Sequence, residues 1–182
     1  MSDRARRPAV APPPVRTAVA HSDNPQTLVQ QHYAHVWLTR MMDMPFVNSA
    51  LQVEAIGFVR HDGDWLGVIV TPWFLNLFLL NGGGSLWQDI SAGQRRLVNL
   101  PCGTLQFIAD DDPELGLYQY CPLIAAVGPL ADHATARQAA LDALQAVLTP
   151  AVEPEPTGPS ATELDVKAAS RRGFFRKIGG RT

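Results

Sequence analysis

The chain has 182 residues, of which 46% are hydrophobic and 18% are charged, with 15 prolines, 14 glycines and two cysteines. This length and apolar fraction fit one globular domain and exclude a largely disordered chain. No run of about 20 apolar residues is present, so we expect no membrane-spanning helix. The prolines that follow the basic N-terminus argue against a secretory signal. Two cysteines provide neither a disulfide framework nor a four-cysteine metal site, which favours a reduced, cytoplasmic setting.

Charge is distributed unevenly along the chain. Residues 1–20 carry four arginines and one aspartate, residues 21–150 carry five arginines and twelve acidic residues, and residues 151–182 carry six basic and four acidic residues. An acidic central part argues against a nucleic acid partner, because nucleic acids are bound mainly through their phosphates. It is compatible with a basic peptide partner, and equally with ordinary solubility.

Composition divides the chain into three parts. We predict a basic, proline-rich, disordered arm at residues 1–22 and a folded domain at residues 23–150. A proline-rich linker and a basic tail are expected at residues 151–182.

Two segments of the central part have helical periodicity. After Asn24 and Pro25, which suit a helix start, apolar residues recur at spacings of three and four as far as Arg40. This helix is expected to end within Met41–Pro45 because the residue before proline disfavours the helical backbone. The same periodicity predicts a second helix over residues 133–148.

Between the helices, short apolar segments and turn signals predict strands. A hairpin is expected at Asp62-Gly63, followed by a strand, Trp65–Val70, that is apolar on both faces. Residues 73–80 fit either a short helix or a buried strand. An acidic turn is expected at residues 110–114, and further strands at residues 51–58, 96–100, 104–109 and 115–127, the last interrupted at Pro122. The order favours an α+β fold with a mostly antiparallel sheet, flanked by an N-terminal and a C-terminal helix, and disordered termini.

Catalytic and metal-binding motifs are absent from the sequence. It has no G-x-S-x-G elbow and no H-E-x-x-H pair, and Asn81–Gly84 is not followed by the residues of a P-loop. Cys102 and Cys121 have no second cysteine pair for zinc, and each is interpreted as a small buried hydrophobe. The sequence therefore favours a non-enzymatic protein with no catalytic residue, no cofactor and no metal.

Large apolar side chains are dense between Trp65 and Trp87. Most of them must form the core, but part of the segment is expected to be an exposed groove, and exposed aromatic patches mark partner sites. Asn48, Glu54 and Asn76 lie among apolar neighbours, where they either lock loops or anchor an extended peptide.

Two stretches, Met44–Phe58 and Trp65–Leu77, resemble the HybE family (HupJ- and HoxT-like) of nickel–iron hydrogenase assembly chaperones. The turn Leu100-Pro101-x-Gly103 and the segment Leu115-Gly116-x-Tyr118 also match, so the resemblance covers roughly residues 25–150. It implies a non-enzymatic, cytoplasmic maturation factor. Such a factor would bind the hydrogenase small-subunit precursor, or its complex with the large subunit, and hold back export by the twin-arginine route until assembly is complete.

The expected partner-binding residues lie in and beside these matching stretches. They are Pro45, Phe46, Asn48, Glu54, Trp65, Thr71, Pro72, Trp73 and Asn76. Two alternatives to a chaperone stay open at this point. One is a subunit bound permanently to the hydrogenase, and the other is a metallocentre-handling protein that uses Cys102 or Cys121.

The tail carries a motif of its own. Residues 170–177 follow the S-R-R-x-F-x-x-K pattern of a twin-arginine signal, with Arg171, Arg172 and Phe174 at its defining positions. Only five residues follow, so we do not expect a working export signal. Either the tail is a solvated basic segment, or it mimics a signal and occupies the chaperone's own signal site, in cis or in a neighbouring chain.

Overall fold

The computed structural model describes residues 14–150. The elements are, in chain order, α1 (Gln26–Val36), η1 (Trp37–Met41), β1 (Glu54–His61), β2 (Asp64–Val70), β3 (Leu75–Leu80), β4 (Arg95–Leu100), β5 (Gly103–Asp112), β6 (Gly116–Ile124) and α2 (His133–Leu148). The strands form one antiparallel sheet in the order β1-β2-β3-β6-β5-β4. The expected α+β class, an antiparallel sheet flanked by an N-terminal and a C-terminal helix, is confirmed.

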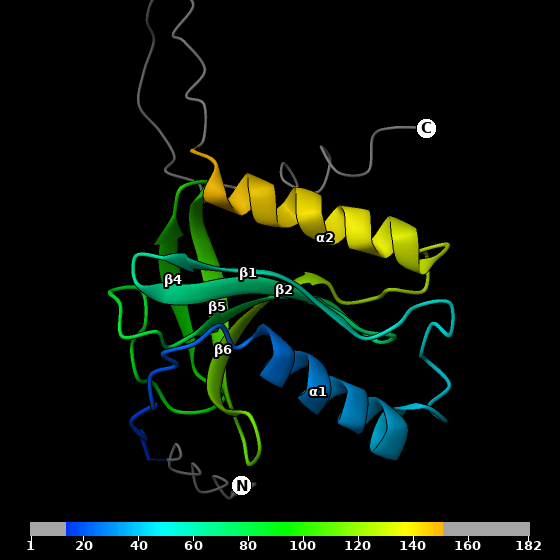
Figure 1. Ribbon diagram of the computed structural model, residues 1–182, viewed down its shortest axis with the longest axis horizontal. Helices are drawn as coiled ribbons and strands as arrows, with labels where there is room; N and C mark the ends of the chain where they lie inside the picture. Colours follow the sequence, from blue (N-terminus) through cyan, green and yellow to red (C-terminus); the bar gives the residue numbers. More distant parts are fainter. Residues whose placement is uncertain (1–13, 151–182) are drawn as a thin grey trace, which may run out of the picture.

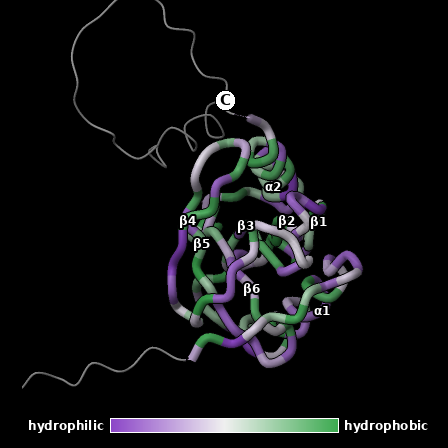
Figure 2. The backbone as a smooth tube through the Cα atoms, turned by 90° about the vertical axis from the view of Figure 1, so that its left-hand side faces the viewer, coloured by the Kyte–Doolittle hydropathy of each residue, from purple (hydrophilic) through white to green (hydrophobic). Residues whose placement is uncertain are grey.

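The two helices lie on opposite sides of the half of the sheet that β1 and β2 form (Figure 1). Side chains alternate along β2, so that Leu66 and Val68 join the core beneath α2 while Trp65 and Ile69 join the core beneath α1. Every residue of β2 is buried, as its continuous apolar sequence predicts. Figure 2 shows α1 and α2 well apart, with the strands between them.

The predicted hairpin between β1 and β2 is confirmed. Asp62 and Gly63 have φ values of 49° and 87°, the left-handed backbone that a two-residue turn of the favoured type needs. Asp64 follows and is wholly buried. Its carboxylate accepts hydrogen bonds from the backbone N–H groups of Gly82 and Gly84. These bonds hold the glycine-rich loop against the hairpin and give the loop a structural role.

The start of α1 differs slightly from the prediction, and a short π-helical turn continues the helix to its predicted end. Asn24 was expected to cap the helix, but Pro25 occupies the cap position, and Asn24 accepts a hydrogen bond from the Gln26 N–H at 2.9 Å. Beyond α1, η1 is a π-helical turn in which the Met42 N–H donates to the Trp37 carbonyl at 3.0 Å. The helical segment then ends before Pro45, as expected.

Two strand boundaries near the first hairpin could be defined only from the structure. β1 begins at Glu54 rather than at Leu51, because the Leu51 N–H donates to the Asn48 carbonyl in a turn. Residues 73–80, which fitted a helix or a strand, form β3 from Leu75 onward. β3 is buried throughout because it lies between β2 and β6 in the sheet.

Two predictions for the second half of the sheet were wrong. The acidic turn does not include Asp110–Asp112, because these residues extend β5 and pair with β6. β6 is not interrupted at Pro122, which pairs with Asn76 beside an irregularity in the register. Proline is tolerated there because the irregularity locally disrupts the ladder of backbone hydrogen bonds.

Some residues of the predicted N-terminal arm, which spans residues 1–22, form hydrogen bonds with the folded part of the chain. The His21 N–H donates to the Asn81 carbonyl at 2.8 Å, and the Ala18 N–H donates to the Asp89 carboxylate at 3.0 Å. The hydrogen-bonded part of the chain therefore begins before residue 23, because these backbone groups find partners in the loop that follows β3.

Candidate partner-binding site

A row of seven aromatic rings crosses the α1 side of the molecule. Successive rings lie 5.0–6.1 Å apart between their centroids, in stacked, tilted or edge-on contacts that aromatic pairs favour. In order of contact, this aromatic row consists of Trp37, Trp73, Phe74, Tyr33, Phe78, Tyr118 and Tyr120.

The fold brings these rings together from distant parts of the sequence. Tyr118 and Tyr120 share one face of β6 because strand side chains alternate, and Tyr120 pairs with Phe78 of β3. The turn before β3 is held by Thr71, whose hydroxyl accepts from the Phe74 N–H at 2.9 Å and donates to the Phe74 carbonyl at 3.0 Å. This turn presents two rings of the row to the helical segment.

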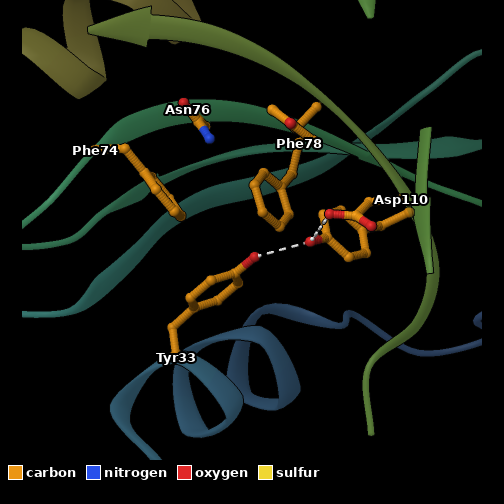
Figure 3. A pocket seen from close by; sticks show the side chains of 7 residues that line it. Tyr33, Phe74, Asn76, Phe78 and Asp110 are labelled. Carbon is orange, nitrogen blue, oxygen red and sulfur yellow. Dashed lines mark hydrogen bonds between the residues drawn. The ribbon is translucent and has the colours of Figure 1, made fainter. Parts of the chain in front are cut away.

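The aromatic row borders a pocket of about 140 Å³ (Figure 3). Tyr33 reaches it from α1, and the other side chains reach it from the sheet and from the turn before β3. Asn76 in its wall is 6% exposed, and its Oδ1 atom has no hydrogen-bond partner among the described residues. The full lining is Tyr33, Phe74, Asn76, Phe78, Asp110, Tyr118 and Tyr120.

A chain of hydrogen bonds runs along one side of the pocket. The Tyr33 hydroxyl donates to the Tyr118 hydroxyl at 3.3 Å, and the Tyr118 hydroxyl donates to Oδ2 of Asp110 at 3.0 Å. Burial, with the nearby Asp110 charge as a smaller cause, raises the pKa of both tyrosines well above the usual range, so both stay protonated. Asp110 takes part in none of the ion pairs formed within residues 14–150.

Acidic residues gather at the Tyr118 end of the aromatic row, in residues 110–114, which we call the acidic end. Burial acts to raise the pKa of Asp112, but hydrogen bonds from the backbone N–H groups of Leu115 and Glu114 outweigh it, and the pKa is lowered. The His32 ring nitrogens lie 3.4 Å from both the Asp112 and the Glu114 carboxylates. Arg16 forms an ion pair with Asp111. The acidic end therefore has four carboxylates against one paired arginine and one histidine ring, and it keeps an excess of negative charge.

Exposed apolar side chains lie at the Trp37 end of the row. Leu38, Met42, Met44 and Phe46 are 65%, 50%, 43% and 61% exposed, and we call them the apolar end. Contiguous exposed apolar surface marks partner sites on folded domains. Methionine side chains are flexible and polarisable, which suits an apolar partner of variable shape.

Four of the predicted partner-binding residues belong to this region. Pro45 and Phe46 are exposed at the apolar end, Trp73 is half-buried in the aromatic row, and Asn76 lines the pocket. Trp73 and Asn76 therefore belong to the aromatic row and its pocket, whereas Pro45 and Phe46 follow the helical segment that carries Trp37.

Four other predicted residues contact the protein's own core or loops. Thr71 and Pro72 are buried. Trp65 is 8% exposed, and its indole N–H donates to the His21 carbonyl at 2.9 Å. Asn48 binds two carbonyls of the loop before α2 through its side-chain amide, and its backbone N–H donates to the Pro72 carbonyl at 2.7 Å.

Glu54 lies apart from the others, between β1 and α2. Its two carboxylate oxygens lie 2.9 Å from His133 Nε2 and 2.9 Å from Arg137 Nε. His133 Nδ1 accepts from the Gln52 N–H at 3.2 Å, so Nε2 carries the ring proton and donates it to Glu54. This cluster connects β1 to α2, and its hydrogen bonds and ion pairs within residues 14–150 involve no residue of the aromatic row.

Sequence reasoning missed several residues of the site, notably Tyr33, Asp110, Tyr118 and Tyr120. Tyr118 and Tyr120 lie two residues apart in an apolar segment. This spacing places both side chains on one face of a strand, and it could have identified them from the sequence. Asp110 was missed because its segment was interpreted as a turn. The predicted tail residues, Arg171, Arg172 and Phe174, lie outside the described residues.

Other kinds of site have little support within residues 14–150. No group of three or more His, Cys, Asp and Glu side chains there could hold a metal ion, and no helix there is long and apolar enough to cross a membrane. Cys121 is buried in β6. Cys102 lies half-buried in the β4–β5 turn, where burial raises the pKa of its thiol and so reduces the reactive thiolate.

Three rings of the aromatic row, Tyr33, Phe78 and Tyr118, are buried in the core, and the other four are half-buried. The four half-buried rings, with acidic groups at one end of the row and exposed apolar side chains at the other, have the composition of a protein-binding surface. Comparison with known proteins agrees with this class. The family described as "[NiFe]-hydrogenase assembly, chaperone, HybE" matches residues 24–177. The chain therefore belongs to the HybE family, as its sequence motifs indicated.

Individual relatives point the same way. The chain is 32% identical over 169 residues to the hydrogenase expression/formation protein HupJ of Bradyrhizobium diazoefficiens, covering 91% of this chain and 93% of that protein. It is 37% identical over 116 residues to a probable rubredoxin HupJ of Rhodobacter capsulatus, covering 64% of this chain but spanning only 40% of that longer protein. The solution structure of HybE from Escherichia coli shares the fold, with a TM-score of 0.59, 21% identity, and coverage of 84% of this chain and 95% of that one.

Proposed function

We propose that the protein is a non-enzymatic, cytoplasmic chaperone that binds the small-subunit precursor of a nickel–iron hydrogenase, alone or with the large subunit. By binding the precursor's twin-arginine signal it delays export until assembly is complete. The supporting observation is the aromatic row with its acidic end and its apolar end. A twin-arginine signal has a basic head followed by an apolar segment, so the two halves of the signal match the two ends of the row.

Charge and exposure suggest a different role for the acidic end and for the apolar end of the aromatic row. The acidic end attracts the two arginines, and Asp110 there has no basic partner among the described residues. The apolar end offers side chains that are still largely exposed and gain most from being covered. The half-buried rings of the row between them provide the large, rigid contacts that dominate binding energies.

Calorimetric titration of the full chain with a synthetic twin-arginine signal peptide from a hydrogenase small subunit tests the proposal. A peptide with both arginines replaced by lysine is the control, because lysine keeps the charge but lacks the planar fork of donors. Saturable binding that the lysine peptide weakens about tenfold, a loss of about 1.4 kcal/mol, is expected. Absence of binding to either peptide would refute signal recognition and favour a chaperone that recognises folded hydrogenase surfaces.

Two protein variants locate the binding. Asp110→Asn removes one negative charge beside the pocket and is expected to weaken the signal peptide. Asp142→Asn removes the same charge from the exposed face of α2, where the carboxylate contacts only Gln138, and is expected to leave the affinity unchanged. Equal weakening by both variants would mean that net charge, rather than the site, governs binding.

Copurification distinguishes the chaperone from a permanent hydrogenase subunit. A chaperone should be recovered with the precursor and should be absent from the exported, mature enzyme. Recovery with the mature enzyme in a fixed ratio would instead establish the permanent subunit.

A further inference from the structure

Asp110 is the only charged residue in the lining of the pocket, and it faces no cation in an ion pair within residues 14–150. Its carboxylate accepts hydrogen bonds from the Tyr118 hydroxyl at 3.0 Å and from the Asp111 N–H at 2.9 Å. Oδ1 of Asn76 has no partner among the described residues, but it is closed off from the pocket, and the amide nitrogen lies on the pocket side (Figure 3). A half-buried carboxylate without a cation is costly, so a ligand that brings positive charge to Asp110 would be favoured.

The rest of the pocket narrows the chemistry of that ligand. Its other five lining side chains are aromatic rings. A guanidinium group is a planar cation with five N–H donors and no acceptor, and it stacks on aromatic faces. The ammonium group of lysine has the positive charge but lacks the planar shape and the paired N–H donors of a guanidinium group. The pocket therefore matches the head of an arginine side chain better than that of a lysine.

We propose that this pocket is a socket for one arginine side chain and that, without a client, Arg171 or Arg172 of the chain's own tail occupies it. The inference rests on the proposed function, because the same socket would receive the client's twin arginines. The tail is the favoured occupant because it repeats the signal pattern and is basic, whereas the socket lies at the acidic end. Phe174 lies two residues after Arg172 and would add an aromatic side chain to this contact.

The length of chain permits this contact within one molecule. The end of α2 lies on the β4–β5 turn, where the Cys102 N–H donates to the Val147 carbonyl at 3.3 Å. Asp110 is eight residues further along β5, about 27 Å away at the rise of an extended strand. Twenty residues separate Pro150 from Arg171. A chain of that length extends to about 70 Å, and a random coil of that length averages about 25 Å.

Tethering sets the size of the effect. A tail held on a linker of this length has an effective concentration on the order of 1 mM at the socket. If the free tail binds with a dissociation constant of about 0.1 mM, the tail occupies the socket in about 90% of molecules. A client then binds about tenfold more weakly than it would bind a chain without the tail. The tail would therefore exclude weak basic ligands while yielding to a client signal.

The test compares the full chain with its Arg171→Lys/Arg172→Lys variant, which keeps the charge and alters no described contact. The small-subunit signal peptide is expected to bind the variant about tenfold more tightly than the unmodified chain. A synthetic peptide of residues 168–178 is expected to bind the variant saturably. Adding Asp110→Asn should abolish that binding, whereas adding Asp142→Asn should preserve it.

The outcomes separate this inference from the proposed function. Binding of the signal peptide with equal affinity to both chains, and no binding of the tail peptide, would overturn tail occupancy while the chaperone proposal stands. Absence of binding by both peptides would overturn both. A dimer that forms with rising concentration in sedimentation velocity, and is lost in the lysine variant, would overturn occupancy within one chain. Tail binding that survives Asp110→Asn would overturn the socket.

Discussion

The hydrogen-bond chain beside the pocket predicts different costs for two substitutions that each remove one hydroxyl. Tyr118 is its middle member, since it accepts from Tyr33 and donates to Asp110. Tyr33→Phe removes only the first bond, which is long at 3.3 Å. Tyr118→Phe removes both bonds and leaves the Tyr33 hydroxyl, in a residue 6% exposed, without an acceptor.

The expected magnitudes follow from those partners. A neutral hydrogen bond contributes about 0.5–1.5 kcal/mol, so Tyr33→Phe should cost about 0.5–1 kcal/mol of unfolding free energy. Tyr118→Phe loses a bond to a carboxylate, which contributes about 1.5–3 kcal/mol, and leaves a buried donor unsatisfied at about 1–3 kcal/mol. Asp110 is half-buried and partly regains water, so we expect a total of about 2–4 kcal/mol.

Urea denaturation of the full chain, followed by tryptophan fluorescence, measures these differences. Tyr120→Phe is the matched control, because the Tyr120 hydroxyl has no hydrogen-bond partner among the described residues and the residue is half-buried. It should change the unfolding free energy by less than about 0.5 kcal/mol. If Tyr33→Phe costs as much as Tyr118→Phe, or more, the assignment of Tyr118 as the central member is wrong.

Three further predictions follow from local geometry. Burial raises the pKa of all three tyrosines. Their contribution to the unfolding free energy is therefore complete below pH 10 and declines as the pH rises above 10. Urea unfolding at pH 9 and at pH 11 measures this decline. Gly57→Ala, at φ 64° with its new Cβ 2.5 Å from Leu144 Cδ2, should cost about 2–5 kcal/mol by strain and overpacking. Gly93→Ala, at φ 82° with open space around it, should cost only about 1–2 kcal/mol, and equal losses would refute the packing component. Burial raises the pKa of the Cys102 thiol, so at pH 8 Cys102 should react with iodoacetamide more slowly in the native protein than in urea. Cys102→Ser should leave hydrogenase maturation intact. A Cys102→Ser variant that folds but fails in maturation would restore the metallocentre alternative.

Local patterns were enough to predict most of the fold. The apolar spacing of three and four in residues 133–148 predicted α2 at its observed limits, and Asp62-Gly63 predicted the first hairpin, because both signals depend on neighbours in sequence. Residues 73–80 stayed ambiguous, since a short apolar run fits a buried strand or a buried helix equally well. Pairing with β2 and β6, which is non-local, settled that segment as β3.

The candidate site was predicted less completely. Phe46, Trp73 and Asn76 were identified in the sequence, and the structure places them along the aromatic row or at its apolar end. Trp65 and Thr71 were identified for the same apolar context, but their polar atoms are used within the fold. A sequence pattern shows that a side chain is surrounded by apolar residues, but not whether a partner or the core provides them.

The family, the α+β class, the two helices and the acidic charge of the central part can all be predicted from the amino-acid sequence. These features depend on periodicity, turn chemistry and composition, which short segments show without the rest of the chain. The fold was needed to show that Tyr33 of α1, Asn76 of β3 and Asp110 of β5 line one pocket. Their closeness depends on strand order, and β3 pairs with β6 across more than 30 intervening residues, a choice made by burial over the whole sheet rather than by any local signal.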